Sequence, residues 1–186
     1  MAKTAAKIRF KAKLLRPALS GKVDSWTFLT LPVGASAKLP SRAKTTVDGT
    51  INGHRFRATL EPDGQRSHWL KVSRKIREAA GAAAGDVVML EIAAAAKEPE
   101  PRIPPDLRKV LATAPAARAV WSDITALARR DWIHWIESAK QPGTRERRID
   151  TACSMLAAGK RRVCCFDRSG IYSKVFSSPK AASNHE

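Results

Sequence analysis

Six basic side chains near one predicted helix–helix junction have the residue types and the spacing best suited to chemistry. They fall in residues 127–140 and 144–149, two helix-like stretches with Gly143 between them. The six are Arg129, Arg130, Lys140, Arg145, Arg147 and Arg148. Guanidinium groups recognise carboxylates and phosphates through paired hydrogen bonds. The cluster is therefore a candidate clamp for an anion or for an anionic partner.

A structural role is the alternative for this cluster, and it is the one we expect. Glu146 can pair with Arg129 or Arg130, and Asp150 lies within one helical turn of Arg147. Such pairs would fix the turn between the two helices and would leave less positive charge free for a ligand.

The first turn of the helix over residues 144–158 also favours a structural role for these arginines. Thr144 is the expected N-cap, which places Arg145 and Arg148 near a helix N-terminus. The helix dipole disfavours positive charge there. We therefore expect Arg145 or Arg148 to contact a carboxylate or a main-chain carbonyl that ties this helix to the preceding one.

No catalytic residues and no cofactor are expected. The sequence has no Gly-x-Ser-x-Gly elbow, no His-Glu-x-x-His helix, no phosphate-binding loop and no dinucleotide glycine fingerprint. His54 falls in a predicted turn, His68 in a predicted strand and His134 on the polar, solvated face of a predicted helix. Without a nucleophile or an orienting carboxylate beside them, these histidines favour a non-enzymatic protein.

No metal site is expected from the three cysteines, because they lack the Cys-x₂-Cys pairs of zinc sites. Cys153 lies on an apolar stripe and is predicted to pack as a small hydrophobic residue. Cys164 and Cys165 are adjacent, so their Cα atoms are about 3.8 Å apart, below the usual disulfide range. We expect reduced thiols, either as two ordinary strand residues, which we favour, or as a reactive vicinal dithiol.

The charge of the chain indicates an anionic partner. Its 34 Lys and Arg residues against 17 Asp and Glu residues give a net charge of +17, and both halves of the sequence carry an excess of positive charge. Such a field attracts acidic proteins, nucleic acids and anionic lipid headgroups alike, and it also keeps a protein soluble. We expect the partner to be a protein or another anionic macromolecule, with weak nucleic-acid binding as the alternative.

The N-terminus favours a cytoplasmic location. Lys7, Arg9, Lys11 and Lys13 interrupt every apolar run in the region where a signal peptide would have its hydrophobic core. The longest uncharged apolar stretch, residues 92–96, is too short to span a bilayer.

The first half of the chain predicts a small split β-barrel with one short helix. Residues 8–16 alternate apolar and basic positions, as in a half-buried strand, and Asn52-Gly53 is a strong hairpin signal. Ser73 is the expected cap of a helix over residues 74–80. The predicted strands are residues 8–16, 26–31, 46–51, 55–60, 68–72 and 87–92.

The second half predicts about four helices after a proline-rich linker, so the fold class is α+β. Helical periodicity places Trp132 in the core and Trp135 at its edge. Residues 163–166 and 171–176 are expected to form a short hairpin. The predicted helices are residues 106–113, 115–122, 125–139 and 144–158. The predicted organisation is a barrel at 8–93, a linker at 94–103, a helical domain at 104–160 and a partly disordered extension at 161–186.

Several ordered segments resemble the YdeI/OmpD-associated, bacteriocin-protection family. In the helical half these are Ile103-Pro104-Pro105-Asp106-Leu107, residues 115–121, Ala128-Arg129-Arg130-Asp131-Trp132, residues 135–140 and residues 144–149. Residues 8–92 are similar to the β-barrel domain of unknown function that often precedes that family's helical domain, through residues 49–53, 70–72, 76–77 and 85–88. The resemblance implies a role in tolerance of bacteriocins or cationic antimicrobial peptides, and it brings no catalytic residues.

Overall fold

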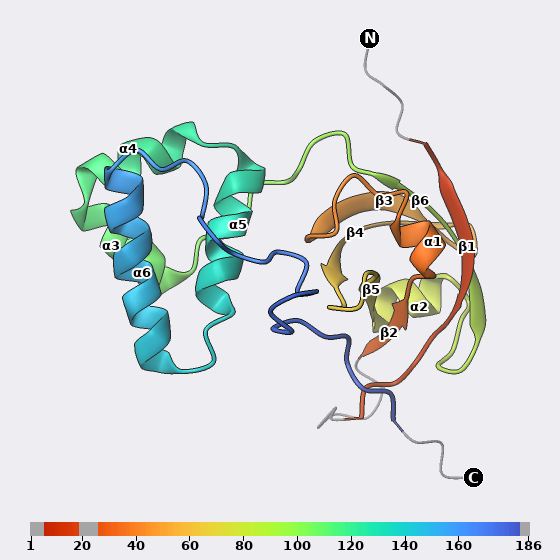
Figure 1. Cartoon of the computed structure of the whole chain (residues 1–186). Coiled ribbons are helices and arrows are strands. Elements are labelled where there is room, and N and C mark those ends of the chain that lie inside the picture. The colour runs from red at the N-terminus through yellow and green to blue at the C-terminus, as the bar shows by residue number, and fades with distance from the viewer. Residues whose placement is uncertain (1–5, 19–25, 183–186) are drawn as a thin grey trace. The chain divides into compact units, whose positions relative to one another are not determined.

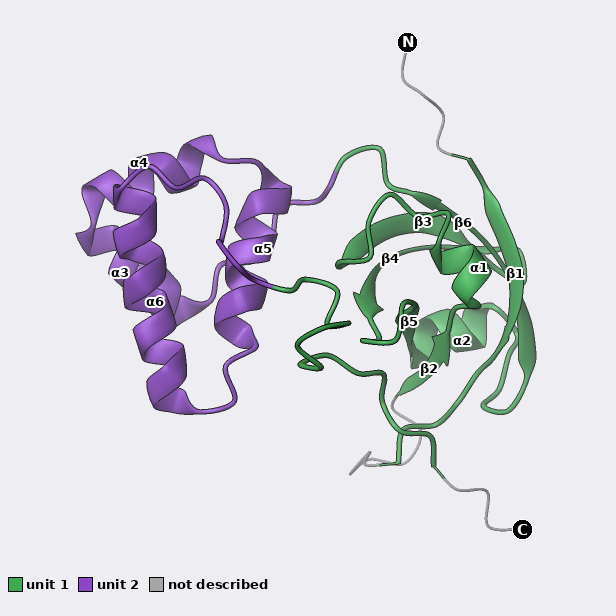
Figure 2. Cartoon of the chain, in the orientation of Figure 1, with its two compact units in different colours: residues 1–97, 167–186 green, residues 98–166 purple. Residues whose placement is uncertain are grey.

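The chain folds into two compact units, each of which is described here by itself. The computed structural model describes residues 6–18 and 26–182. One unit comprises residues up to 97 together with those from 167 onward, and the other comprises residues 98–166 (Figure 2). The helical unit is thus inserted between two segments that both belong to the first unit.

The first unit is a curled six-stranded antiparallel sheet, which confirms the predicted α+β class (Figure 1). Its spatial order is β1-β6-β3-β4-β5-β2, and a bridge between Leu15 and Phe28 joins the chain beyond β1 to β2. Asn52 and Gly53 form the predicted hairpin turn with φ values of 46° and 83°. The strands are β1 (Ile8–Lys13), β2 (Trp26–Thr30), β3 (Thr45–Ile51), β4 (His54–Pro62), β5 (His68–Ser73) and β6 (Val87–Ala94).

The period-two pattern of the strands separates a buried face of the sheet from an exposed one. On β1, Ile8 and Phe10 point into the core while Arg9 and Lys11 are exposed. The register pairs Ile8 with Ile92, so buried residues of neighbouring strands meet on the same face. The inside of the curled sheet therefore holds one hydrophobic core, and the cations of β1 lie outside it.

Two short helices accompany the sheet, one expected and one not. Helix α2 (Arg74–Ala79) begins where predicted, and the Ser73 hydroxyl accepts a hydrogen bond from the Ile76 N–H at 3.3 Å. Helix α1 (Val33–Ser36) was not predicted from the sequence, because four residues are too few to show a helical period. Its last residue, Ser36, contacts the Nδ1 atom of His68 at 2.7 Å.

His68 is a buried structural residue of β5 and it links α1 to the strands. Its Nε2–H donates to the Ala43 carbonyl at 2.9 Å, so its Nδ1 atom accepts from the Ser36 hydroxyl. Burial lowers the pKa of His68, although the Ala43 hydrogen bond acts in the opposite direction. The neutral imidazole is therefore the form that the fold stabilises.

The fold should consequently lose stability on mild acidification. The unfolded chain takes up the His68 proton near pH 6.5, whereas the folded chain takes it up only at lower pH. The contribution of His68 to the free energy of unfolding is therefore complete above about pH 6.5 and declines as the pH falls. Urea denaturation between pH 7 and pH 5.5 measures the decline. We expect a shallower pH dependence for His68→Gln, and equal slopes for both proteins would contradict this prediction.

The second unit consists of four helices, as expected (Figure 1). Proline occupies the first helical position of α3, α4 and α6, where its missing N–H costs no hydrogen bond. The Thr125 hydroxyl caps α5 by accepting from the Ala128 N–H at 3.2 Å. The helices are α3 (Pro105–Thr113), α4 (Pro115–Asp123), α5 (Ala126–Glu137) and α6 (Pro142–Ala157).

The core of the helical unit forms around Trp132, which is fully buried as predicted. Trp135 is half-buried at the core's edge, also as predicted, and its ring meets that of Trp132 edge-on at 6.1 Å. His134 contradicts its prediction, since it is buried and stacks edge-on against Phe166 at 5.4 Å. This face of α5 would be exposed in an isolated helix, but the chain that follows α6 covers it.

The segment after residue 166 does not form the predicted hairpin. Instead the Asp167 carboxylate accepts hydrogen bonds from the N–H groups of Ser169, Gly170, Tyr172 and Ser173. Burial alone would raise the pKa of this carboxyl, but hydrogen bonds from Ser169, Ser173 and Tyr172 hold it well below its ordinary value. A charged carboxylate therefore organises the turn at low cost.

The end of the described chain joins the first unit by backbone pairing. Pro17 and Ala181 form an antiparallel bridge, the Ala18 N–H donates to the Lys180 carbonyl, and the Ala182 N–H donates to the Arg16 carbonyl. The C-terminal segment is thus part of the sheet unit, although the helical unit separates it from the sheet in sequence.

Candidate functional site

The paired arginines of α5 bind carboxylates from the proline-rich segment that precedes the helices. Arg129 forms two contacts with Glu100, at 2.6 and 2.9 Å, and its guanidinium also donates to the Trp121 carbonyl. Arg130 pairs with Glu98. Both arginine side chains are largely buried, with 15% and 12% of their surface exposed. The prediction that Glu146 would supply the partner is wrong.

Arg145 fastens the start of α6 to the start of α3. Its Nε and Nη2 atoms donate to the two oxygens of Asp106 at 2.7 and 3.1 Å, a bidentate pair. The hydrogen bond from Arg145 holds the pKa of Asp106 below its ordinary value, and the Leu107 N–H adds to the effect. The carboxylate lies in the first turn of α3, where the helix dipole also favours it.

Arg148 ties α6 to the C-terminal end of α5. Its guanidinium donates to the Trp135 carbonyl and to the Ser138 hydroxyl, and it lies 5.3 Å from the centre of the Trp135 ring. Carbonyls at a helix C-terminus lack partners within the helix, and a cation satisfies them well. These contacts and those of Arg145 confirm that an arginine of this cluster joins α6 to its neighbours.

The two other members of the cluster remain exposed. Arg147 donates to the Thr144 hydroxyl at 3.2 Å, and Lys140 lies between α5 and α6. Thr144 is not the N-cap, because α6 begins two residues earlier at Pro142. Anion binding by the whole cluster stays a prediction, and the contacts of the arginines at 129, 130, 145 and 148 favour a structural role for those four.

Replacing Arg145 by Lys should lower the free energy of unfolding of the helical unit. Lysine keeps the charge but loses the fork that holds both oxygens of Asp106. Because the pair is partly exposed, we expect a loss of about 0.5–1 kcal/mol. Chemical denaturation measures it, with Arg147→Lys as the matched control on the same helix. An equal effect of both substitutions would contradict the structural role of the Arg145 fork.

A second cluster of cations lies on the outer face of the curled sheet, and we call it the basic sheet face. Its members are Lys7, Arg9, Lys11, Lys13, Arg55 and Arg57, all exposed. The strand register places Arg9 opposite Glu91, Glu91 opposite Thr50, and Thr50 opposite Arg55, so one row crosses four strands. Residues opposite one another on antiparallel strands share a face of the sheet.

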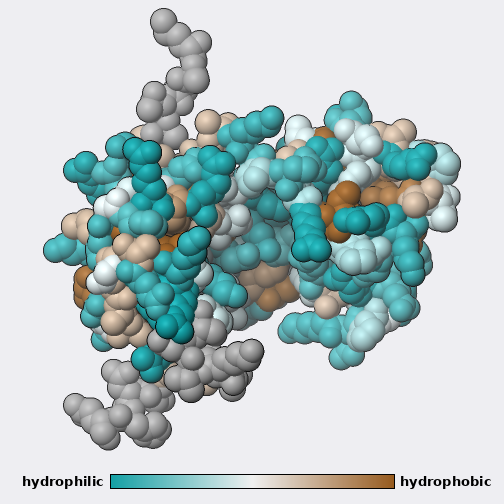
Figure 3. All heavy atoms as spheres, turned by 180° about the vertical axis from the view of Figure 1, so that it is seen from behind, coloured by the Kyte–Doolittle hydropathy of each residue, from teal (hydrophilic) through white to brown (hydrophobic). Residues whose placement is uncertain are grey.

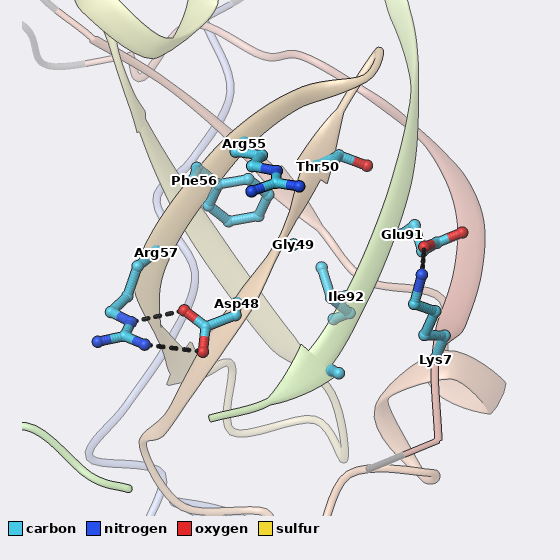
Figure 4. Close-up of a pocket in the computed structure, with 10 residues that line it drawn as sticks. Lys7, Asp48, Gly49, Thr50, Arg55, Phe56, Arg57, Glu91 and Ile92 are labelled. Carbon is cyan, nitrogen blue, oxygen red and sulfur yellow. Dashed lines mark hydrogen bonds and ion pairs between the residues drawn. The ribbon is translucent and has the colours of Figure 1, made fainter. Parts of the chain in front are cut away.

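A groove of about 600 Å³ lies within this face (Figure 4). Its lining includes Lys7, Asp48, Thr50, Arg55, Arg57 and Glu91. A Cβ atom on Gly49 would lie 2.3 Å from the Glu91 carbonyl oxygen, so β3 and β6 approach this closely only because residue 49 is glycine.

Two carboxylates in the groove partly neutralise its cations. The Nε and Nη2 atoms of Arg57 donate to the two oxygens of Asp48 at 2.5 and 2.9 Å, and this hydrogen bonding lowers the pKa of Asp48. Glu91 pairs with Lys7 at 2.6 Å and with Arg9 at 2.5 Å, and Lys7, followed by Arg9, lowers the pKa of Glu91. Both carboxylates are therefore charged at neutral pH.

Three cations of the basic sheet face have no carboxylate partner among the described residues. Arg55, Lys11 and Lys13 make no hydrogen bond or ion pair with any residue that the structure describes. Lys11 lies opposite Met89 and Lys13 opposite Val87, two exposed apolar side chains of β6. The alternation in residues 8–16 predicted this strand, but its outer row was not identified as a candidate site. Cations at every second position, in 7–13 and again in 55–57, were the signal.

Two family models match the chain, one on each unit. A model described as bacteriocin-protection, YdeI or OmpD-associated matches residues 100–159, which contain the four helices. A model for a domain of unknown function, DUF1905, matches residues 10–92, which hold the curled sheet. The helical part of the chain is therefore similar to the YdeI/OmpD-associated family, and the part before it is similar to DUF1905. The order of the two matches is the one that the resemblance implied. No curated protein matches the chain.

The match over residues 100–159 points to bacteriocin protection by its description alone and gives no chemistry. Neither family description names an enzymatic activity. Among the described residues, no three His, Cys, Asp or Glu side chains are placed to hold a metal ion. No helix in the described ranges is long and apolar enough to cross a membrane. Hydrophilic side chains cover most of the face shown in Figure 3.

Proposed function

We propose that this protein is a non-enzymatic binding protein that contributes to bacteriocin protection by binding an anionic macromolecule. The basic sheet face carries the proposal. It presents Arg55, Lys11 and Lys13 without a carboxylate partner among the described residues, beside a groove of about 600 Å³. The net charge of +17 adds a long-range attraction for anions.

The same charge argues against direct capture of cationic antimicrobial peptides. Two positively charged partners repel one another, and like charges brought together at an interface cost several kcal/mol. A protective role is therefore better explained by binding to an anionic component of the cell. An acidic protein is our first candidate for that component. A cytoplasmic location remains a prediction from the sequence.

Nucleic acid is the second candidate, because cations at every second position of a strand suit a phosphate backbone. Single strands also need exposed aromatic rings on which bases can stack. Trp69 meets Phe28 edge-on at 6.4 Å, and Lys71 lies over the Trp26 ring at 4.7 Å, so both half-buried tryptophans already have neighbours. Phe56 lines the groove but is only 8% exposed, so it offers little ring surface for stacking, which ranks nucleic acid below an acidic protein.

A charge-reversal experiment tests the proposal. The variant Lys11→Glu/Lys13→Glu/Arg55→Glu changes the basic sheet face, and Lys109→Glu/Arg118→Glu/Lys160→Glu makes the same change in charge on exposed positions of the helical unit. A strain that lacks the gene is complemented with each variant and challenged with bacteriocin. We expect the first variant to fail and the control to protect. Protection by both, or failure of both, would contradict the assignment to the basic sheet face.

Binding assays separate the two partner classes. Retention on immobilised poly-glutamate and binding to labelled DNA and RNA oligonucleotides are measured across a range of salt concentrations. We expect the oligonucleotide affinity to be weak and lost by physiological salt, as for any strongly basic protein. Nanomolar oligonucleotide binding at physiological salt, removed by the sheet-face substitutions, would instead establish nucleic acid as the ligand.

A further inference from the structure

The two adjacent cysteines near the end of the helical unit hold their sulfur atoms together on the surface. Helix α6 ends at Ala157, and Gly159 adopts the left-handed conformation with φ of 82°. Beyond it Cys164 and Cys165 are exposed and lie in an irregular segment, so they are not the strand residues that the sequence predicted. Their Sγ atoms are 3.0 Å apart.

The backbone at Cys165 helps to bring the two sulfurs together. Successive side chains of an extended strand point to opposite faces, which would separate the thiols. Cys165 has a φ of 56°, a left-handed conformation that is uncommon for a residue with a side chain. This local departure from extended geometry is compatible with both thiols lying on the same side of the chain.

The contact between the two sulfurs also affects the pKa of Cys165. The hydrogen bond and the charge of Cys164 raise the pKa of Cys165, so Cys165 keeps its proton at neutral pH. Two arginines close in sequence are engaged elsewhere, since Arg161 pairs with Asp123 and Arg162 with Asp131.

We propose that Cys164 and Cys165 form a chelating dithiol site for a trivalent arsenical. Trivalent arsenic binds sulfur strongly and is pyramidal, with bonds to two sulfurs that meet near a right angle. Two thiols held close together suit that geometry. A tetrahedral zinc ion with Zn–S bonds of about 2.3 Å would need sulfurs about 3.8 Å apart and two further ligands. The described residues offer no group of three metal-binding side chains.

A disulfide between the two cysteines is the less favourable product. Their Cα atoms are fixed about 3.8 Å apart by the peptide bond, whereas disulfides usually span about 4.4–6.8 Å. Inserting an arsenic atom between the sulfurs relieves this constraint, because the sulfurs need not approach bonding distance. The site is therefore better suited to chelation than to oxidation.

The reaction needs no oxidant. An arsenoxide, R–As=O, meets the two thiols, and two As–S bonds form as the As=O bond breaks. The oxygen leaves as one water molecule with the two thiol protons, and arsenic stays trivalent. Binding through two linked thiolates raises the overall affinity by about 10²–10⁴ over one thiolate alone.

Phenylarsine oxide, added to the full-length protein, tests the site. Intact-mass spectrometry is expected to show one phenylarsenic unit per chain with the loss of two hydrogens, reversed by a dithiol and not by an equal amount of a monothiol. Cys164→Ser and Cys165→Ser should each weaken binding at least about a hundredfold, since each removes the chelate. Cys153→Ser is the matched control. Cys153 is buried, and burial raises the pKa of its thiol, so its loss should leave binding unchanged.

Three results would overturn the proposal. The first is no adduct on the wild-type protein although a monofunctional alkylating agent modifies both exposed thiols. The second is an adduct that survives in either single-serine variant with unchanged affinity. The third is formation of a Cys164–Cys165 disulfide by mild oxidants more readily than the arsenical adduct. Circular dichroism of each variant shows that it is folded, so a loss of binding reports on the thiols.

Discussion

Trp132→Ala should lower the free energy of unfolding of the helical unit by about 3–5 kcal/mol, the range for deleting a large buried aromatic ring. Trp132 has no exposed surface and packs in the same core as Leu107, Ile136 and Leu156, which are also fully buried. Removing the indole leaves a cavity that four short helices cannot easily fill. Urea denaturation followed by circular dichroism measures the loss.

A second substitution separates the packing of Trp132 from its polar group. Its indole N–H has no hydrogen-bond partner among the described residues, although it is buried. Trp132→Phe removes that unpaired donor, so the gain offsets part of the lost packing, and we expect a loss below about 1.5 kcal/mol. Trp135→Ala is the control at the core's edge and should cost less than Trp132→Ala. An alanine effect at Trp132 below about 1 kcal/mol would mean that the core is elsewhere.

The elements could be predicted because their signals are local. Proline at positions 105 and 115 marks the first turn of two helices, and Asn52-Gly53 marks a hairpin whatever the rest of the chain does. The alternation around Phe10 shows which face of β1 is buried. Each of these signals depends on a few neighbouring residues, and the structure places the corresponding elements within a few positions of the predicted ones.

The failed predictions concern contacts between residues that are distant in sequence. His134 lies on the polar side of an isolated helix, but Phe166 covers it from beyond the end of α6. Helix α1 ends at Ser36, whose hydroxyl contacts His68, 32 positions further along the chain. A helical wheel carries no information about either partner.

The arginine cluster shows the same limit for the candidate site. Glu146 was predicted as a partner of Arg129 or Arg130 because all three lie near the same predicted helix–helix junction. The observed partners, Glu98 and Glu100, precede α3, the first helix of the helical unit, by several residues. Which arginines remain for a ligand therefore follows from the tertiary structure, and so does the row from Arg9 through Glu91 and Thr50 to Arg55 that crosses four strands.

Glu98→Ala should destabilise the helical unit more than Glu100→Ala, although both residues pair with neighbouring arginines of α5. The side chains of Glu98 and Arg130 are only 20% and 12% exposed, whereas that of Glu100 is 58% exposed. Losing Glu98 leaves a largely buried guanidinium without this partner, which we expect to cost about 2–3 kcal/mol. Losing Glu100 should cost less than about 1 kcal/mol, because water replaces the exposed carboxylate.

The double variant Glu98→Ala/Arg130→Met distinguishes a buried charge effect from a packing effect. Methionine keeps much of the arginine's apolar volume and removes the charge, so we expect it to recover at least half of the stability lost in Glu98→Ala. Limited proteolysis gives an independent readout, since residues 98–102 should be cut faster once Glu98 no longer holds them to α5. Equal losses for Glu98→Ala and Glu100→Ala, with no recovery in the double variant, would mean that these arginines do not anchor the segment. The alternative interpretation of the cluster, in which Arg129 and Arg130 bind an anion, would then gain support.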